Sequence, residues 1–181
     1  LKRTPASFLG SCRYKLPEIS ADKTIYERIF EILEELEITA FFYIGGNDSM
    51  DTIKKLSDYA QTVDSPIRFI GVPKTIDNDL EGTDHTPGYG SAAKYIATVT
   101  KELVRDGLIY EMQSVTVIEI MGRNAGWLTG AAVLAKSEDC EGPDLIYLPA
   151  GPFDVDDFLE KVKQLVAEKQ SIVIAVSEGI K

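Results

Sequence analysis

Hydrophobic positions recur along the chain with two different periods. Stretches with apolar residues three and four positions apart predict amphipathic helices, and they alternate with short unbroken apolar runs that predict buried strands. The predicted helices are residues 21–36, 49–63, 88–107, 124–136 and 155–169, and the predicted strands are residues 38–46, 66–73, 114–122, 144–149 and 171–179. Alternation of helix and strand indicates βαβ units and a mostly parallel sheet covered on both faces. We therefore expect an α/β fold of the Rossmann-like, three-layer αβα type.

Glycine and polar residues follow the predicted strands. Glycines stand at four strand ends, at Gly45–Gly46, Gly71, Gly122 and Gly179. Ligands of open parallel sheets bind outside the carboxyl ends of the strands. We expect one crevice there, formed by the polar residues Asn47, Asp48, Thr75, Asp77, Asp79, Arg123 and Glu178.

Composition and charge narrow the class of protein. The chain has 181 residues, enough for one α/β domain with its own core, and its formal net charge of −10 argues against a nucleic-acid partner and anionic membrane surfaces. Cys12 and Cys140 lack metal-ligand spacing, which indicates a reducing compartment.

Because the chain also has neither a membrane span nor a secretory signal, we expect a cytoplasmic protein. It does not begin with Met, so we expect it to start within a longer protein.

The segment GGNDS, residues 45–49, is a glycine turn before a predicted helix. Glycines allow a phosphate to approach the backbone, and the free N–H groups at a helix start favour an anion. The alternative is a tight turn in which Asp48 or Ser49 caps the helix. The segment alone leaves both interpretations open.

Two further segments carry candidate chemistry. In TIDND, residues 75–79, one carboxylate could accept a proton from a hydroxyl while the other helps to hold Mg²⁺. The alternative is an Asx-rich turn. In MGRNAG, Arg123 follows a strand and precedes a helix, where a guanidinium suits phosphate recognition, although a surface arginine at a turn is the alternative.

Four segments together resemble the phosphofructokinase family. They are GGNDSMDTI (45–53), GVPKTIDND (71–79), IEIMGRNAGWL (118–128) and AVSEGI (175–180), in this order and each at a strand end. The resemblance implies the phosphofructokinase fold and transfer of a phosphoryl group to the 1-hydroxyl of fructose 6-phosphate. It implies Mg²⁺ as cofactor and a homo-oligomer for the full-length protein.

The resemblance also implies roles for individual residues. Asp77 matches the family's general base, and Thr75 and Asp79 match its partners in positioning the sugar and the metal-bound phosphate. Met121, Gly122 and Arg123 match the family's sugar-phosphate segment, and Glu178 matches the residue that binds a sugar hydroxyl. Arg13 matches an arginine directed at the transferring phosphate. Gly46, Asn47 and Ser49 match the phosphoryl-donor loop.

Asp48 and Lys74 bear on the phosphoryl donor. Members that use ATP usually have glycine at both positions, so this pair resembles the pyrophosphate-dependent branch. A carboxylate at Asp48 would face the α-phosphate of a nucleotide, and like charges about 4 Å apart repel by about 4 kcal/mol at an effective dielectric near 20. Lys74 would pair with a pyrophosphate oxygen, unless it is a solvent-facing turn lysine. Asn47 replaces a metal-binding aspartate of many members, so the expected Mg²⁺ site relies on Asp48 or on pyrophosphate itself, with Asp79 as a second candidate ligand.

The resemblance covers nearly the whole chain but not the whole family pattern. Residues 1–181 match most of the catalytic, donor-binding domain up to the start of the sugar-phosphate domain, without the family's first strand and C-terminal part. We expect this central piece to be inactive alone and to expose surface that the other parts cover. Ser114 stands where bacterial ATP-dependent members commonly carry an arginine that reaches a neighbouring subunit, so the arrangement of subunits is left open.

Three other functions fit parts of this pattern. An ATP-dependent 6-phosphofructokinase with an altered loop is the first, and a non-catalytic regulatory subunit of the same fold is the second. An intact TIDND segment argues against the second, because such a subunit has no need of Asp77. The third is another sugar-phosphate or diacylglycerol-type kinase that shares the glycine loop, and MGRNAGW and SEGI argue against it.

Overall fold

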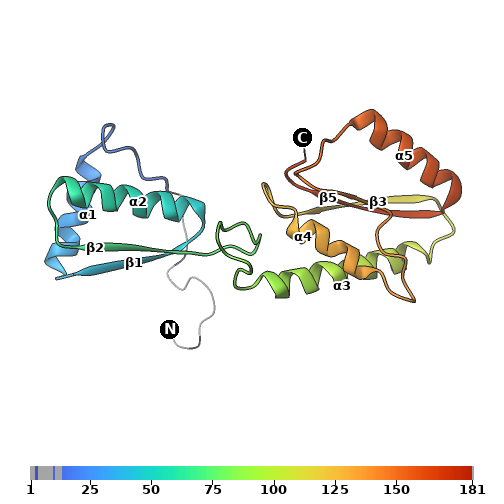
Figure 1. Ribbon diagram of the computed structural model, residues 1–181, viewed down its shortest axis with the longest axis horizontal. Coiled ribbons are helices and arrows are strands. Elements are labelled where there is room, and N and C mark those ends of the chain that lie inside the picture. Colours follow the sequence, from blue (N-terminus) through green and yellow to red (C-terminus); the bar gives the residue numbers. More distant parts are fainter. Residues whose placement is uncertain (1–2, 4–9, 11–13, 181) are drawn as a thin grey trace. The chain divides into compact units, whose positions relative to one another are not determined.

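The computed structural model describes residues 3, 10 and 14–180, which form helices and parallel strands as predicted. The chain divides into two compact units, Leu1–Lys74 and Thr75–Lys181 (Figure 1). The elements are α1 (Thr24–Glu35), β1 (Ala40–Gly45), α2 (Asn47–Thr62), β2 (Arg68–Pro73), α3 (Tyr89–Gly107), β3 (Ser114–Ile120), α4 (Trp127–Gly130), the 3₁₀ helix η1 (Ala131–Ala135), β4 (Leu145–Tyr147), α5 (Val155–Glu168) and β5 (Ser171–Ser177). The α/β prediction is confirmed.

The strands lie in two sheets. In the first unit β1 pairs with β2, and in the second the order is β3-β5-β4, with every pair parallel. The prediction that residues 1–181 form most of one catalytic domain stays a prediction. In the described part of the chain, no helix is long and apolar enough to cross a membrane.

The first unit has a core on one face of its sheet. Helices α1 and α2 contribute Tyr26, Phe30 and Tyr59 to this core, and Phe41 and Phe69 of the two strands pack against it. Alternate strand residues point to opposite faces, and the register pairs Phe42 with Ile70 and Ile44 with Val72 on the other face. Those four side chains are exposed, Ile44 by 69%. This unit therefore carries an exposed apolar sheet face.

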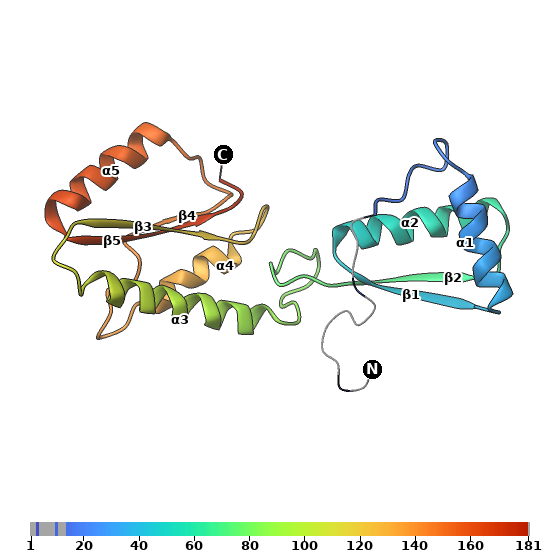
Figure 2. The same ribbon diagram turned by 180° about the vertical axis from the view of Figure 1, so that it is seen from behind.

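The second unit has the three predicted layers. Ile172, Ile174 and Val176 of β5 pack toward α5, whereas Val173 and Ala175 lie in clusters with residues of α3, α4 and η1. Figures 1 and 2 show α5 on one side of this sheet and α3 with α4 on the other. The central strand β5 is covered on both faces, which agrees with the unbroken apolar run IVIAV, residues 172–176, in its sequence.

The helix predicted over residues 124–136 is the main local difference. It forms a single α-helical turn, α4, followed by η1. Ala131, Ala132 and Ala135 of η1 are buried, Ala132 completely. Their small side chains let this tight segment pack closely beneath the sheet.

Candidate active site

The loop that starts at Thr75 presents its acidic residues from a hydrogen-bonded turn. The Thr75 Oγ1 accepts a hydrogen bond from the Asp77 N–H, with an N–O distance of 3.0 Å. Asn78 is buried, Asp77 is half-buried and Asp79 is exposed. The bond is a local turn bond accepted by the hydroxyl of Thr75 and not by an Asp or Asn side chain, so it does not decide for the Asx-turn alternative. The outward carboxylate of this turn, Asp79, remains accessible for chemistry.

The turn after β3 is joined to the end of β5. The Ser177 hydroxyl donates to the Gly122 carbonyl at 2.6 Å, and the Gly122 N–H donates to Glu178 Oε1 at 3.1 Å. The Glu178 N–H also donates to the Ile120 carbonyl at 3.0 Å. The structure therefore brings Gly122, Arg123 and Glu178 together, because β3 and β5 are paired strands.

Two glycines make this junction sterically feasible. Gly122 has a φ of 129°, a conformation that favours glycine. A Cβ placed on Gly179 would lie 1.8 Å from the Arg123 carbonyl oxygen. The backbone of Arg123 is thus packed against Gly179, whereas the residue as a whole is exposed.

The first helix turn after β1 carries the predicted donor loop. The N-cap of α2 is Gly46, and no side chain caps this end, so the interpretation of Asp48 or Ser49 as the cap is wrong. Asp48 is exposed in the first turn, where a carboxylate is favoured by the helix dipole. Ser49 lies against the end of β1, because a Cβ on Gly45 would meet its Oγ at 2.1 Å.

Lys74 lies beside this loop, at the end of the neighbouring strand. Its N–H donates to the Gly45 carbonyl at 2.8 Å, which extends the pairing of β1 with β2. A Cβ on Gly46 would lie 3.8 Å from the Lys74 carbonyl oxygen. Lys74 and Asp48 are both exposed, and among the described residues no ion pair joins them. The side chains of both predicted donor selectors are thus available to a ligand.

The remaining predicted residues have different outcomes. Met121 and Asn47 are exposed, and Met121 directly follows β3. Arg13 lies outside the described residues. Because the candidates are divided between the two compact units, their meeting in one crevice stays a prediction.

The metal prediction rests on single carboxylates. In the described ranges, no group of three or more His, Cys, Asp or Glu residues could hold a metal ion. Mg²⁺ is usually held by one or two carboxylates together with substrate phosphates. The exposed carboxylates of Asp48 and Asp79 are suitable oxygen donors for that kind of site.

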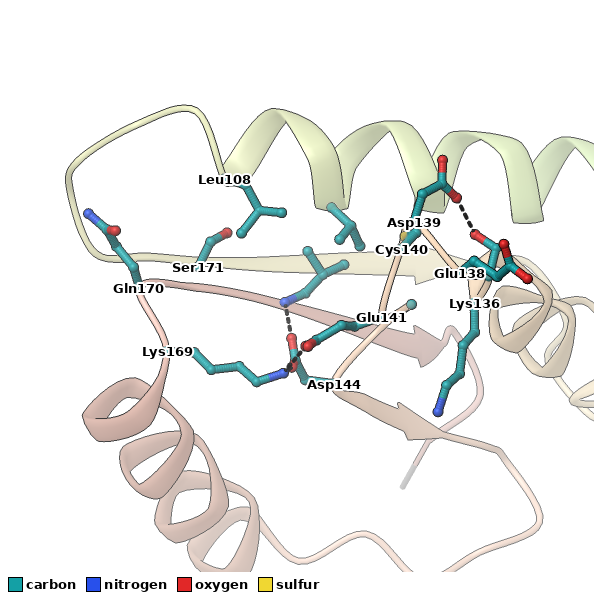
Figure 3. Close-up of a pocket in the computed structure, with 14 residues that line it drawn as sticks. Leu108, Lys136, Glu138, Asp139, Cys140, Glu141, Asp144, Lys169, Gln170 and Ser171 are labelled. Carbon is teal, nitrogen blue, oxygen red and sulfur yellow. Dashed lines mark hydrogen bonds and ion pairs between the residues drawn. The ribbon is translucent and has the colours of Figure 1, made fainter.

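A separate pocket lies in the second unit near the amino-terminal end of β5 (Figure 3). It has a volume of about 590 Å³ and is lined by the loop 136–142 and by residues at the start of β5. Lys169 Nζ contacts Asp144 at 2.8 Å and Glu141 at 2.6 Å, and these hydrogen bonds raise the pKa of Lys169. The predicted site residues follow the other ends of the strands, so this pocket is distinct from the candidate site.

Two residues of the candidate site were missed from the sequence. Ser177 is 1% exposed, and its hydroxyl holds the turn that contains Arg123. Asn78 is 9% exposed and bonds across its own loop. The sequence offered one signal for each: Ser177 directly precedes Glu178, and Asn78 stands between Asp77 and Asp79.

Comparisons with known proteins agree with the motifs. The chain is 46% identical to the pyrophosphate–fructose 6-phosphate 1-phosphotransferase of Xanthomonas campestris, over 99% of this chain and 44% of that protein. It is 44% identical to the enzyme of that name from Halomonas elongata, over 99% of this chain and 43% of that protein. The fold is similar to the crystal structure of the pyrophosphate-dependent phosphofructokinase from Nitrosospira multiformis, with a TM-score of 0.78 and 43% sequence identity. The match covers 95% of this chain and 42% of that one.

The match covers this chain fully but its relatives only in part. The chain spans less than half the length of the curated relatives it matches. The family model "Phosphofructokinase" matches residues 1–181, which is the whole chain. The chain therefore belongs to the phosphofructokinase family.

Proposed function

We propose that the full-length protein transfers a phosphoryl group from pyrophosphate to the 1-hydroxyl of fructose 6-phosphate, giving fructose 1,6-bisphosphate. The observation that carries this proposal is the placement of Asp48 and Lys74 beside each other in the first unit: Asp48 lies in the helix turn after β1, and Lys74 follows the paired strand β2. The names of relatives 44–46% identical to the chain support the same donor and acceptor.

The donor is selected by charge and bulk. Asp48 is exposed in the first turn of α2, where the backbone N–H groups favour an anionic ligand. A nucleotide would bring its α-phosphate against this carboxylate, and a repulsion of about 4 kcal/mol corresponds to about 10³-fold weaker use of ATP. Pyrophosphate has no α-phosphate or nucleoside to place there, and the Lys74 ammonium supplies a cation for one of its oxygens.

The acceptor hydroxyl is activated by Asp77. A positioned base contributes about 10²–10⁴-fold to the rate. Thr75 restrains the Asp77 backbone through the 3.0 Å hydrogen bond, while Arg123 and Glu178, joined through the Gly122 turn, bind the sugar phosphate and a sugar hydroxyl. Phosphoryl transfer depends mainly on such positioning and on charge neutralisation.

Positive charge comes from side chains and from a metal. Lys74, Arg123 and Arg13 are the cationic residues assigned to the phosphates. Asp48, with Asp79 as the second candidate, would hold Mg²⁺, which when bound neutralises phosphate charge. The proposed enzyme is a cytoplasmic homo-oligomer.

The proposal is tested with the full-length protein. We expect formation of fructose 1,6-bisphosphate with pyrophosphate and Mg²⁺, and a rate at least about 100-fold lower with ATP. We also expect the reverse reaction, in which phosphate and fructose 1,6-bisphosphate yield pyrophosphate. A faster rate with ATP would favour the ATP-dependent alternative, and a folded protein without activity with either donor would favour the regulatory subunit.

A further inference from the structure

Asn78 differs from the two aspartates beside it. Its residue is only 9% exposed, whereas Asp79 is exposed and Asp77 is half-buried. Its φ is 59°, in the left-handed region that Asn adopts more readily than most residues. At Asn78 the chain therefore directs one side chain inward between two acidic residues.

The inward amide closes the loop that follows it. Asn78 Oδ1 accepts a hydrogen bond from the Thr86 N–H at 2.8 Å, and Asn78 Nδ2 donates to the Asp84 carbonyl at 3.2 Å. Thr86 is completely buried, and its carbonyl accepts from the N–H of Tyr89, the first residue of α3. One side chain thus links the TIDND segment to the start of a 19-residue helix.

Few side chains could replace this amide. The site requires a donor and an acceptor on one short side chain, together with tolerance of a left-handed backbone. An aspartate would keep the acceptor but place a carboxylate oxygen against the Asp84 carbonyl. A glycine would keep the backbone conformation and lose both hydrogen bonds.

We infer that Asn78 is a positioning residue for Asp77, an inference that rests on the proposed function. The peptide unit of Asp77 is restrained from both sides, by Thr75 at its N–H and by Asn78 as the next residue. Release of one restraint lets the carboxylate of Asp77 move relative to the acceptor hydroxyl. A displacement of about 1 Å from the reactive geometry can cost about 10²-fold in rate.

A kinetic and an exchange measurement on the full-length protein test this role. For Asn78→Gly we expect kcat to fall about 10- to 100-fold, with both KM values changed less than about two-fold. We also expect the Thr86 amide to exchange its hydrogen faster, because its acceptor is gone. The matched control is Asp64→Gly, at an exposed left-handed residue with a φ of 53° in the turn after α2, which should leave both readings unchanged.

Asn78→Asp provides a second variant if the glycine variant does not fold. It keeps the size of the side chain and the acceptor for Thr86, so we expect the Thr86 amide to stay protected while kcat still falls, because the bond to Asp84 is lost.

Three results separate the explanations. A kcat of Asn78→Gly within two-fold of wild type, with a deprotected Thr86 amide, would show that Asn78 closes the loop without positioning Asp77. A rise in both KM values at unchanged kcat would assign it to ground-state binding and also overturn the inference. An inactive wild-type protein would instead overturn the proposed function.

Discussion

The Glu178 carboxylate accepts a hydrogen bond from the backbone N–H of Gly122, with 3.1 Å between Oε1 and N, although the two residues are 56 positions apart. The contact joins the end of β5 to the turn after β3. One carboxylate oxygen therefore holds the backbone next to Arg123, a structural task in addition to the proposed contact with a sugar hydroxyl.

The two tasks of Glu178 can be separated by substitution. Glu178→Gln keeps an oxygen that can accept from Gly122 but removes the charge, so we expect a higher KM for fructose 6-phosphate and little change in the free energy of unfolding. Glu178→Ala should raise KM at least as much and also lower the free energy of unfolding by about 1 kcal/mol. Steady-state kinetics and denaturant unfolding measure both. Equal losses of stability in the two variants would contradict this division.

Ser177 should act on the same turn. Ser177→Ala removes a buried hydroxyl and leaves the Gly122 carbonyl without its 2.6 Å donor, so we expect a loss of about 1–3 kcal/mol in unfolding free energy and a higher KM for fructose 6-phosphate. Ser171→Ala is the matched control at the other end of β5, where the hydroxyl bonds to Ser114 at 3.1 Å. Its KM should stay at the wild-type value, and a similar rise there would argue against a local effect on the turn.

Gly179 should tolerate no side chain. A Cβ at this position would lie 1.8 Å from the Arg123 carbonyl oxygen, so we expect Gly179→Ala to cost about 1–3 kcal/mol and to displace Arg123. Gly130→Ala is the control, because a Cβ there would meet nothing within 4 Å. In a helix turn that change should be neutral or stabilising by up to about 1 kcal/mol. Thermal unfolding compares the two, and equal melting temperatures would refute the steric argument.

Asp139 should contribute a small acid-sensitive part of the stability. The hydrogen bond from Lys101, together with that from Ser137, holds the pKa of Asp139 below its usual range. A carboxyl with a depressed folded-state pKa stabilises the fold above its unfolded pKa of about 3.9, and this contribution is lost as the pH falls through the folded-state pKa. Asp139 is exposed, so the effect should be small.

The measurement for Asp139 is denaturant unfolding as a function of pH. We expect Asp139→Asn to be slightly less stable than wild type at pH 7 and to lose less stability than wild type in acid below about pH 4. Parallel pH dependences of the two proteins would show that the ion pair with Lys101 contributes nothing measurable.

Hydrophobic periodicity predicts elements well because it is local. The unbroken run of β5 marks a strand buried on both faces, and the structure places it at the centre of its sheet. Which strands pair is a non-local property, so the division into β1–β2 and β3-β5-β4 could not be read from the pattern. The 3₁₀ geometry of η1 could not be predicted either, because its alanine-rich sequence is typical of an ordinary α-helix.

The motifs identify residues of the candidate site but not the residues whose hydrogen bonds hold its loops. Arg123 and Glu178 were found because charged residues follow strand ends, and these two strands prove to be neighbours. Asn78 and Ser177 had no such signal. Their partners lie six, eight and 55 residues away and include backbone groups, which no side-chain pattern reveals.

The most direct test of the account is a comparison of phosphoryl donors in wild type and in the double variant Asp48→Gly/Lys74→Gly of the full-length protein. The ratio of kcat/KM for pyrophosphate to that for ATP should be large in wild type and should fall by about 10³-fold in the variant, because the carboxylate that repels the α-phosphate and the cation that binds pyrophosphate are both removed. An unchanged ratio, or a preference for ATP in wild type, would contradict the assignment of Asp48 and Lys74 as donor selectors.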